Sequence, residues 1–413
     1  MPAPSELLAA TPMRLAPDVA VADRFLVPLD HPGAMAYFTS HLRVAHRASE
    51  RLRAALATHG AGSVIGSRAL SRRQLELDPS DRRFSSALAL IEASRDLIES
   101  QLAMASRSFR WILLADYGES RRERATIFLF GPEDPAPRMV VKLRTVRAEG
   151  RSLSDEWDAL QLLESTLPDL LIRSVPAPLG FVERDGIEML ALSTVPGRSA
   201  YVEMQNSLLP SRSVGRHFAA AAEWLAAFQN ATERHDELEL DESPALTSLS
   251  EHERDEISAT LRRHPIRLTA SHGDFWARNV LLHSSGGEVK VVDWEHFAAS
   301  AAPLGDLFHF PLTYTINYPW RRFSRVGAVE AFRNAFLNES VVARGVRNYL
   351  HIFCSRRGID PAVLGSWFRL HLRLMEASTS NGHSERHSEQ GGGYPWRRFH
   401  EMLDRAENSV FSG

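Results

Sequence analysis

The chain has 413 residues, of which 44% are hydrophobic and 24% are charged, and its formal net charge is -3. These proportions are typical of a globular protein, and the charge argues against nucleic-acid binding driven by bulk positive charge. The single cysteine, Cys354, excludes an internal disulfide and a metal site built from several thiolates.

The N-terminal segment lacks the basic stretch and following apolar run of a secretory signal. Elsewhere, no apolar run approaches the ~20 residues that a membrane-spanning helix requires. We therefore expect a cytoplasmic protein with no membrane and no nucleic-acid partner.

The first part of the chain, residues 1–106, shows helical spacing in two segments. Apolar residues recur at helical intervals over 35–57 and again over 85–104, with a polar stretch between them. The sequence therefore predicts a helical N-terminal extension.

The apolar period changes to that of strands in the next part, residues 107–195. Strands are predicted near 109–117, 124–130, 138–145 and 180–194, the last interrupted by a turn at Asp185 and Gly186, and one helix is predicted over 152–166. Pro196 and Gly197 end this run, so we expect a small antiparallel-sheet lobe here.

The remaining part, residues 196–413, has mainly helical patterns. Helices are predicted over 214–231 and 251–264, and several more follow residue 325. The exception is a hairpin, in which two apolar runs flank the turn sequence SSGG at 284–287. The sequence therefore predicts an α+β protein with a helical second lobe.

The hairpin register brings two oxygen-bearing side chains together. Pairing His283 with Glu288 makes Asn279 face Val292, so that Asn279 lies beside Asp293 at the open end. Mg²⁺ commonly takes one or two such oxygen ligands from the protein. The same alternation directs Lys290 to solvent.

Asp274 precedes this hairpin by a short loop, where its carboxylate can accept a proton from an attacking hydroxyl. The segments HGDFWARN (272–279) and VVDWE (291–295) together resemble the signature of the aminoglycoside phosphotransferase and choline kinase-like family. The resemblance implies a protein-kinase-like two-lobe fold, with ATP and Mg²⁺ as cofactors. By the same resemblance Asp274 is the catalytic base, and Asn279 and Asp293 hold the metal.

Two further residues take supporting roles by this resemblance. His272 is expected to support the catalytic loop from behind. Asp306, in the segment PLGDLFHF, is expected to cap backbone amides of a loop.

The family requires a lysine on the third strand to hold ATP phosphates, and Lys142 lies on a predicted strand. Only two of the 48 basic residues among Lys and Arg are lysines. A lysine at this position, in a chain that otherwise uses arginine, therefore supports a role for which the compact ammonium group is needed. Its expected carboxylate partner is Glu156 on the following helix, with Glu164 as the alternative. Backbone groups that would bind adenine lie at Ser193, Thr194 and Val195.

The loop between the first two predicted strands departs from the protein-kinase pattern. It has one glycine, Gly118, in place of a repeated-glycine motif, which favours the small-molecule branch; Gly118 and Ser120 are the candidate phosphate contacts. Arg278, directly before Asn279, either reaches the transferred phosphate or stacks on Trp276.

The favoured hypothesis is an ATP- and Mg²⁺-dependent phosphotransferase that acts on a hydroxyl of a small molecule. A peptide or protein kinase with N-terminal docking helices is one alternative, and a nucleotide-binding pseudokinase scaffold is another. Arginine pairs at 321–322 and 397–398 favour a neutral or anionic acceptor, such as a sugar, over a polycationic aminoglycoside.

Overall fold

The computed structural model describes most of the chain, which forms two compact units. The described residues are 19–22, 25–28, 31–44, 90–91, 110–115, 124–148, 150–236, 251, 255, 258–259, 262–283, 288–320, 326–380, 395–406 and 409–411. The first unit contains Met1–Leu162 and Pro176–Val195, and the second contains Leu163–Val175 and Pro196–Gly413.

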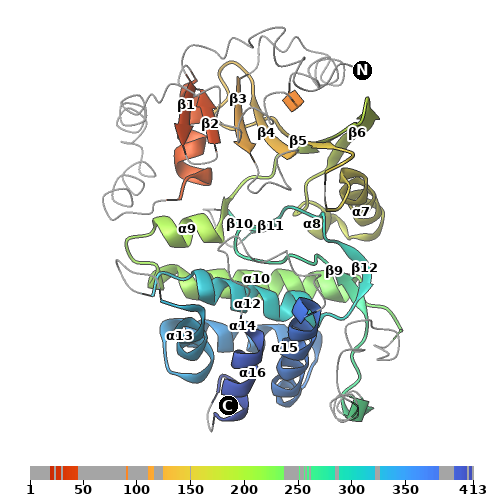
Figure 1. The fold of residues 1–413 in the computed structure, drawn as a ribbon, viewed down its shortest axis with the longest axis vertical. Coiled ribbons are helices and arrows are strands. Elements are labelled where there is room, and N and C mark those ends of the chain that lie inside the picture. Colours follow the sequence, from red (N-terminus) through yellow and green to blue (C-terminus); the bar gives the residue numbers. More distant parts are fainter. Residues whose placement is uncertain are drawn as a thin grey trace. The chain divides into compact units, whose positions relative to one another are not determined.

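A seven-stranded antiparallel sheet forms the first unit, in the order β1-β2-β3-β4-β5-β7-β6 (Figure 1). Its strands are β1 (Val19–Ala22), β2 (Phe25–Pro28), β3 (Arg110–Ala115), β4 (Arg124–Phe130), β5 (Met139–Thr145), β6 (Pro178–Arg184) and β7 (Ile187–Ser193). The last five are the strands that the sequence predicts, and Asp185 and Gly186 form the expected turn. With helix α7 (Leu153–Thr166), the sheet confirms the predicted α+β lobe.

Strands β1 and β2 correct the expectation of a purely helical extension. β2 pairs with β3 and β1 pairs with β2, so residues 19–28 extend the sheet. Each strand is only four residues long, which is too short for a period-two pattern to emerge from the sequence. Pairing is favourable because β3 would otherwise present an open edge.

The predicted extension helices are described only in part. Over 35–57 the structure has α2 (Pro32–Tyr37) and a π-helical turn, Phe38–Leu42, and the helix ends there because Arg43 has an extended backbone. The predicted helix is therefore wrong at residues 43–44, and residues 45–57 lie outside the described part of the chain. Leu90 and Ile91 are helical, and the rest of the predicted helix over 85–104 lies outside the described residues.

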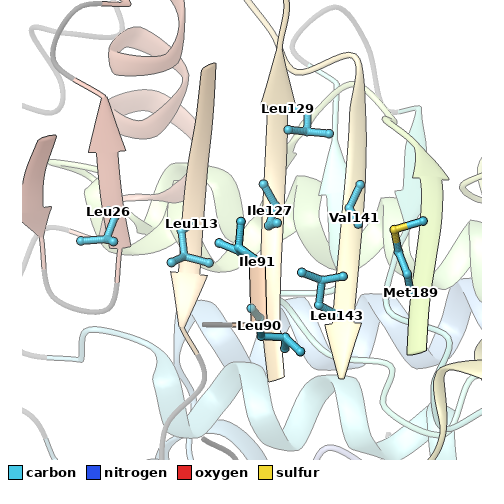
Figure 2. Close-up of a cluster of buried hydrophobic side chains, with 10 residues drawn as sticks. Leu26, Leu90, Ile91, Leu113, Ile127, Leu129, Val141, Leu143 and Met189 are labelled. Carbon is cyan, nitrogen blue, oxygen red and sulfur yellow. The ribbon is translucent and has the colours of Figure 1, made fainter. Parts of the chain in front are cut away.

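One face of the sheet carries an apolar core (Figure 2). Ile127, Val141 and Met189 point to this face from β4, β5 and β7, and Leu90 and Ile91 pack against it. Because side chains alternate along a strand, Lys142 and Arg144 point to the opposite face. The alternation of β5 therefore separates an apolar face from a charged one.

The N-terminal helix α2 packs on the loop that joins β4 to β5. His31 Nε2 lies 2.8 Å from the carbonyl oxygen of Gly131. At Gly33, a Cβ atom would lie 2.0 Å from the carbonyl oxygen of Asp134. Only glycine fits between these two backbone segments without a shift.

Helices dominate the second unit. They are α8 (Asp169–Ile172), α9 (Ala200–Asn206), α10 (Ser211–Ala231), α12 (Leu304–Asn317), α13 (Ala328–Phe332), α14 (Val341–Arg357), α15 (Leu364–Ser380) and α16 (Trp396–Asp404), with the π-helical turn Arg333–Leu337 and the 3-10 turn Pro361–Val363. Phe218 of α10 packs edge-on against Phe310 of α12 and Tyr349 of α14. This aromatic contact joins three long helices into one core, as the predicted helical lobe requires.

Short strands complete the second unit. They are β8 (Arg198–Ser199), β9 (Thr269–Ser271), β10 (Val280–Leu282), β11 (Val289–Val291) and β12 (Ala298–Ala301). β8, β10 and β11 form one small sheet, and β9 pairs with β12. Within the described part of the chain, no helix has both the length and the apolar character needed to cross a membrane.

We expect Gly33→Ala to lower the free energy of unfolding by about 1–3 kcal/mol, because the added methyl group overlaps the Asp134 backbone. The control is Gly215→Ala in α10, where nothing lies within 4 Å of the new Cβ atom. Alanine should stabilise that helix by ~0.5–1 kcal/mol. Urea denaturation followed by circular dichroism measures both, and equal effects would contradict the packing of α2 on this loop.

Candidate functional site

The hairpin of β10 and β11 adopts the predicted register. Val280 pairs with Val291, and the backbone N–H of Val292 donates to the carbonyl oxygen of Asn279 over 3.0 Å. The pairing places Asn279 and Asp293 at the open end of the hairpin.

Asp274 is held next to this open end. Asn279 Nδ2 donates to both the carbonyl oxygen and Oδ2 of Asp274, each over 3.0 Å, and His309 Nε2 lies 3.4 Å from Oδ1. Burial raises the pKa of the Asp274 carboxyl, but the hydrogen bond and charge of His309, with the charges of His272 and His296, hold that pKa well below its usual range. The carboxylate is therefore ionised and fixed in orientation.

The Asn279–Asp293 pair fits the chemistry of a magnesium site. Because Nδ2 of Asn279 is engaged by Asp274, Oδ1 is the atom that this side chain can offer a metal. Asp293 has a φ of 71°, a left-handed conformation that non-glycine residues adopt rarely. Among the residues that the structure describes, no group of three His, Cys, Asp or Glu side chains could hold a metal. An amide oxygen and one carboxylate suit Mg²⁺, which keeps several water or phosphate ligands.

The loop before Asp274 rests on Asp306, at the start of α12. Its carboxylate accepts from the backbone N–H of His272 over 2.7 Å, from that of Gly273 over 3.0 Å and from Ser271 Oγ over 3.0 Å. His272 Nε2 also lies 3.0 Å from the carbonyl oxygen of Val292. The expected amide cap and the expected support from His272 are both confirmed.

Lys290 does not point to solvent, and that prediction is wrong. Its side chain is buried, and Nζ donates to the carbonyl oxygen of Arg173 over 2.9 Å and to Glu288 Oε1. The backbone N–H of Val291 also donates to the carbonyl oxygen of Ser174. The reason is tertiary, because Arg173 and Ser174, which are distant in the chain, bind β11, which a lone hairpin would leave open to solvent.

In the first unit, the lysine expected to hold phosphates has the expected carboxylate partner. Lys142 Nζ lies 2.9 Å from Glu156 Oε1 and 2.7 Å from Oε2. The Glu156 side chain is 1% exposed, whereas the alternative partner, Glu164, is exposed. The inward face of α7 therefore selects Glu156.

The segment expected to bind adenine begins at the end of β7. The backbone N–H of Ser193 already donates to the carbonyl oxygen of Ala177 over 2.9 Å, and Ser193 Oγ accepts from the Ala177 N–H. Thr194 and Val195 follow outside the strand ladder. The candidate N–H donors to adenine in this segment are therefore those of Thr194 and Val195. Gly118 and Ser120 lie outside the described residues.

Arg278 stacks on aromatic rings, as one of its two interpretations requires. The guanidinium carbon lies 4.6 Å from the centre of the Tyr201 ring and 5.1 Å from that of Trp276. The backbone N–H of Tyr201 donates to the carbonyl oxygen of Ala277, which brings α9 to the loop that carries Asp274. The contact with Tyr201 was not predictable, since it joins residues far apart in the chain.

The arginine pairs give little support for an acceptor preference. Arg397 and Arg398 lie exposed on α16, and Arg397 Nε is 3.2 Å from Glu401 Oε1. The pair at 321–322 lies outside the described residues.

His309 is a site residue that the sequence reading missed. It follows Asp306 by three positions on α12, so both side chains lie on one face of the helix. Asp306 supports the loop and His309 reaches the Asp274 carboxylate. The three-residue spacing was the one available signal.

Comparisons with known proteins give a family and several similar structures. The model of the phosphotransferase enzyme family, APH, matches residues 122–349. No curated protein sequence matches the chain.

Three similar solved structures illustrate the likeness. An aminoglycoside-3'-phosphotransferase of type VIII is 14% identical with a TM-score of 0.40, covering 72% of this chain and 99% of that one. An aminoglycoside phosphotransferase, APH(3'')-Id from Streptomyces rimosus, in complex with ADP and streptomycin, is 16% identical with a TM-score of 0.40, covering 70% and 98%. A Plasmodium vivax ethanolamine kinase is 8% identical with a TM-score of 0.43, covering 82% and 92%.

We expect Asp306→Asn to lower the free energy of unfolding by about 2–4 kcal/mol, because an amide group would face buried N–H donors that now meet a carboxylate. The matched control is Asp404→Asn on α16, where the carboxylate is 46% exposed. A surface pair of that kind contributes about 0–1 kcal/mol. Chemical denaturation measures both variants, and a loss at Asp306 no larger than at Asp404 would contradict the capping role.

Proposed function

Because the chain belongs to the phosphotransferase enzyme family, we propose that it transfers the γ-phosphoryl group of ATP, with Mg²⁺, to a hydroxyl of a small molecule. The observation that carries this proposal is the arrangement of Asp274, Asn279 and Asp293 at one end of the hairpin. It combines an oriented proton acceptor with an amide oxygen and a carboxylate suited to a hard cation.

In the first unit, Lys142 would bind the phosphates of ATP. Glu156 supports this role, since both oxygens of its carboxylate accept hydrogen bonds from the ammonium group and fix its position. The N–H groups of Thr194 and Val195 would bind the edge of the adenine ring. Gly118 and Ser120 would contact phosphates from the preceding loop.

In the second unit, Asp274 would orient the acceptor hydroxyl and receive its proton. The lowered pKa of the Asp274 carboxyl makes the carboxylate a weak base. Proton transfer from the acceptor hydroxyl would therefore follow, rather than precede, the weakening of the bond between the γ-phosphoryl group and ADP. Asn279 and His309 hold the carboxylate in one orientation throughout. Most of the rate gain would then come from positioning.

Asn279 Oδ1 and the Asp293 carboxylate would hold Mg²⁺. When bound, the ion neutralises charge on the phosphates. The Asn279–Asp274 hydrogen bond would link the metal ligand to the proton acceptor and fix both in one loop.

A small molecule is the favoured acceptor class. The loop between β3 and β4 has one glycine, Gly118, and lacks the repeated glycines of protein kinases. Screening sugars, aminoglycosides, amino alcohols and serine or threonine peptides for transfer of labelled γ-phosphate tests this choice. Transfer to peptides alone would favour the protein-kinase alternative, and nucleotide binding without any transfer would favour the scaffold.

Asp274→Asn should reduce phosphoryl transfer by a factor of about 10²–10⁴, since the amide cannot accept the hydroxyl proton. The affinity for Mg·ADP should stay near that of the unchanged protein, because Asp274 is not assigned to the metal or the nucleotide. Steady-state kinetics and calorimetry measure the two effects. Asp185→Asn, at an exposed turn, is the control and should leave both unchanged. Normal turnover in Asp274→Asn would refute the role of this residue.

Lys142 should be acylated selectively by an acyl-phosphate derivative of ATP, because its ammonium group would lie against the phosphates. Few competing reactions are expected, since Lys290 is the only other lysine in the sequence and its side chain is buried. Mass spectrometry after digestion compares the two residues, and excess Mg·ATP should suppress the reaction at Lys142. Equal labelling of both lysines, or labelling insensitive to Mg·ATP, would contradict a nucleotide site at Lys142.

A further inference from the structure

A buried carboxylate on β7, that of Glu188, gathers donors from three places in the first unit. Arg144 Nη1 and the backbone N–H of Leu153 each donate to Oε2 over 3.0 Å, and Ser152 Oγ donates to Oε1. The side chains of Arg144 and Glu188 are each only 5% exposed. A carboxylate buried to this degree is costly unless it is fully bonded, so these partners act together.

Strand pairing places this ion pair next to the proposed phosphate-binding lysine. Arg144 lies directly opposite Glu188 in the β5–β7 ladder, and Lys142 lies opposite Leu190. Residues two apart on a strand point to the same face. Lys142 and Arg144 therefore point to the same side of the sheet, the side from which Lys142 reaches α7.

Glu188 also binds the first turn of α7. Leu153 is the first residue of this helix, and its N–H is one of the donors that a helix leaves without an internal partner. Burial raises the pKa of the Glu188 carboxyl, but hydrogen bonds from Ser152, Leu153 and Arg144 hold that pKa below its usual range. An ionised carboxylate thus caps the positive end of α7.

Glu156 lies in that same first turn, three residues after Leu153. The Glu156 carboxylate can reach Lys142 only if the first turn of α7 lies at the matching distance from strand β5. Arg144 reinforces the start, because Nη2 donates to the carbonyl oxygens of Ala148 and Gly150 in the connection that leads from β5 to α7. The strand, the connection and the helix are therefore tied to one ion pair.

We propose that the Arg144–Glu188 ion pair is a positioning device for nucleotide binding. It fixes the start of α7 and so holds Glu156 against Lys142. In this role neither Arg144 nor Glu188 would need to touch the nucleotide. The inference rests on the proposed function, since it takes Lys142 as the phosphate-binding residue.

The experiment measures acylation of Lys142 by the acyl-phosphate derivative of ATP at increasing probe concentration, in the full chain. Glu188→Gln, close in size but uncharged, should raise the half-saturating concentration about tenfold, the size expected when a charge-assisted contact is lost. The matched control is Glu183→Gln, an exposed carboxylate directly opposite Glu188 in the β6–β7 pairing. It should behave as the unchanged protein.

A double-variant cycle with Glu156→Gln separates positioning from general destabilisation. If Glu188 acts through Glu156, the double variant should be no weaker than Glu156→Gln alone, whereas independent effects would multiply. Thermal unfolding of each variant sets a temperature at which all are folded. Glu188→Asp, which keeps the charge but withdraws it by one methylene group, replaces Glu188→Gln if the latter does not fold.

Two results would overturn the inference while leaving the proposed function intact. One is a Glu188 variant that labels like Glu183→Gln, and the other is effects at Glu156 and Glu188 that multiply. Failure of the unchanged protein to label at Lys142, or labelling that Mg·ATP does not suppress, would overturn the proposed function and this inference with it.

Discussion

The pairing of β10 with β11 is the constraint on which the candidate site depends. Because Val280 lies opposite Val291, Asn279 faces Val292 at the open end of the hairpin, and Asp293 follows directly beside it. A shift of one residue would turn each side chain to the other face and separate the two oxygen ligands. The Asn279–Asp274 hydrogen bond then ties the proton acceptor to the same register.

Buried carboxylates hold the backbone segments around both candidate sites. Asp306 binds two N–H groups before Asp274, and Glu188 binds the N–H of Leu153 at the start of α7. In each case a charge that would be unfavourable alone is satisfied by several donors. Asp306 and Glu188 thus fix a loop and a helix end that carry residues of the candidate sites.

Strand β5 contributes alternate residues to the two faces of the sheet. Val141 and Leu143 enter the apolar core from β5 (Figure 2). Lys142 and Arg144 alternate with them and point to the other face. Stability and proposed chemistry are therefore carried by adjacent residues of one strand.

Local pattern in the sequence was enough to predict the α+β class, the strands from β3 to β7 and the hairpin register, because the turn residues and the period of the apolar residues lie within short segments. The Lys142–Glu156 pair was expected from the family resemblance, with Glu164 as the alternative partner, and the structure shows the contact with Glu156. Tertiary structure alone decided the contact of Lys290 with Arg173, the addition of β1 and β2 to the sheet, and the contact of His309 with Asp274. Each of these features joins segments that are far apart in the chain. The spacing of apolar residues within one segment does not indicate which distant backbone or side chain will pack against it.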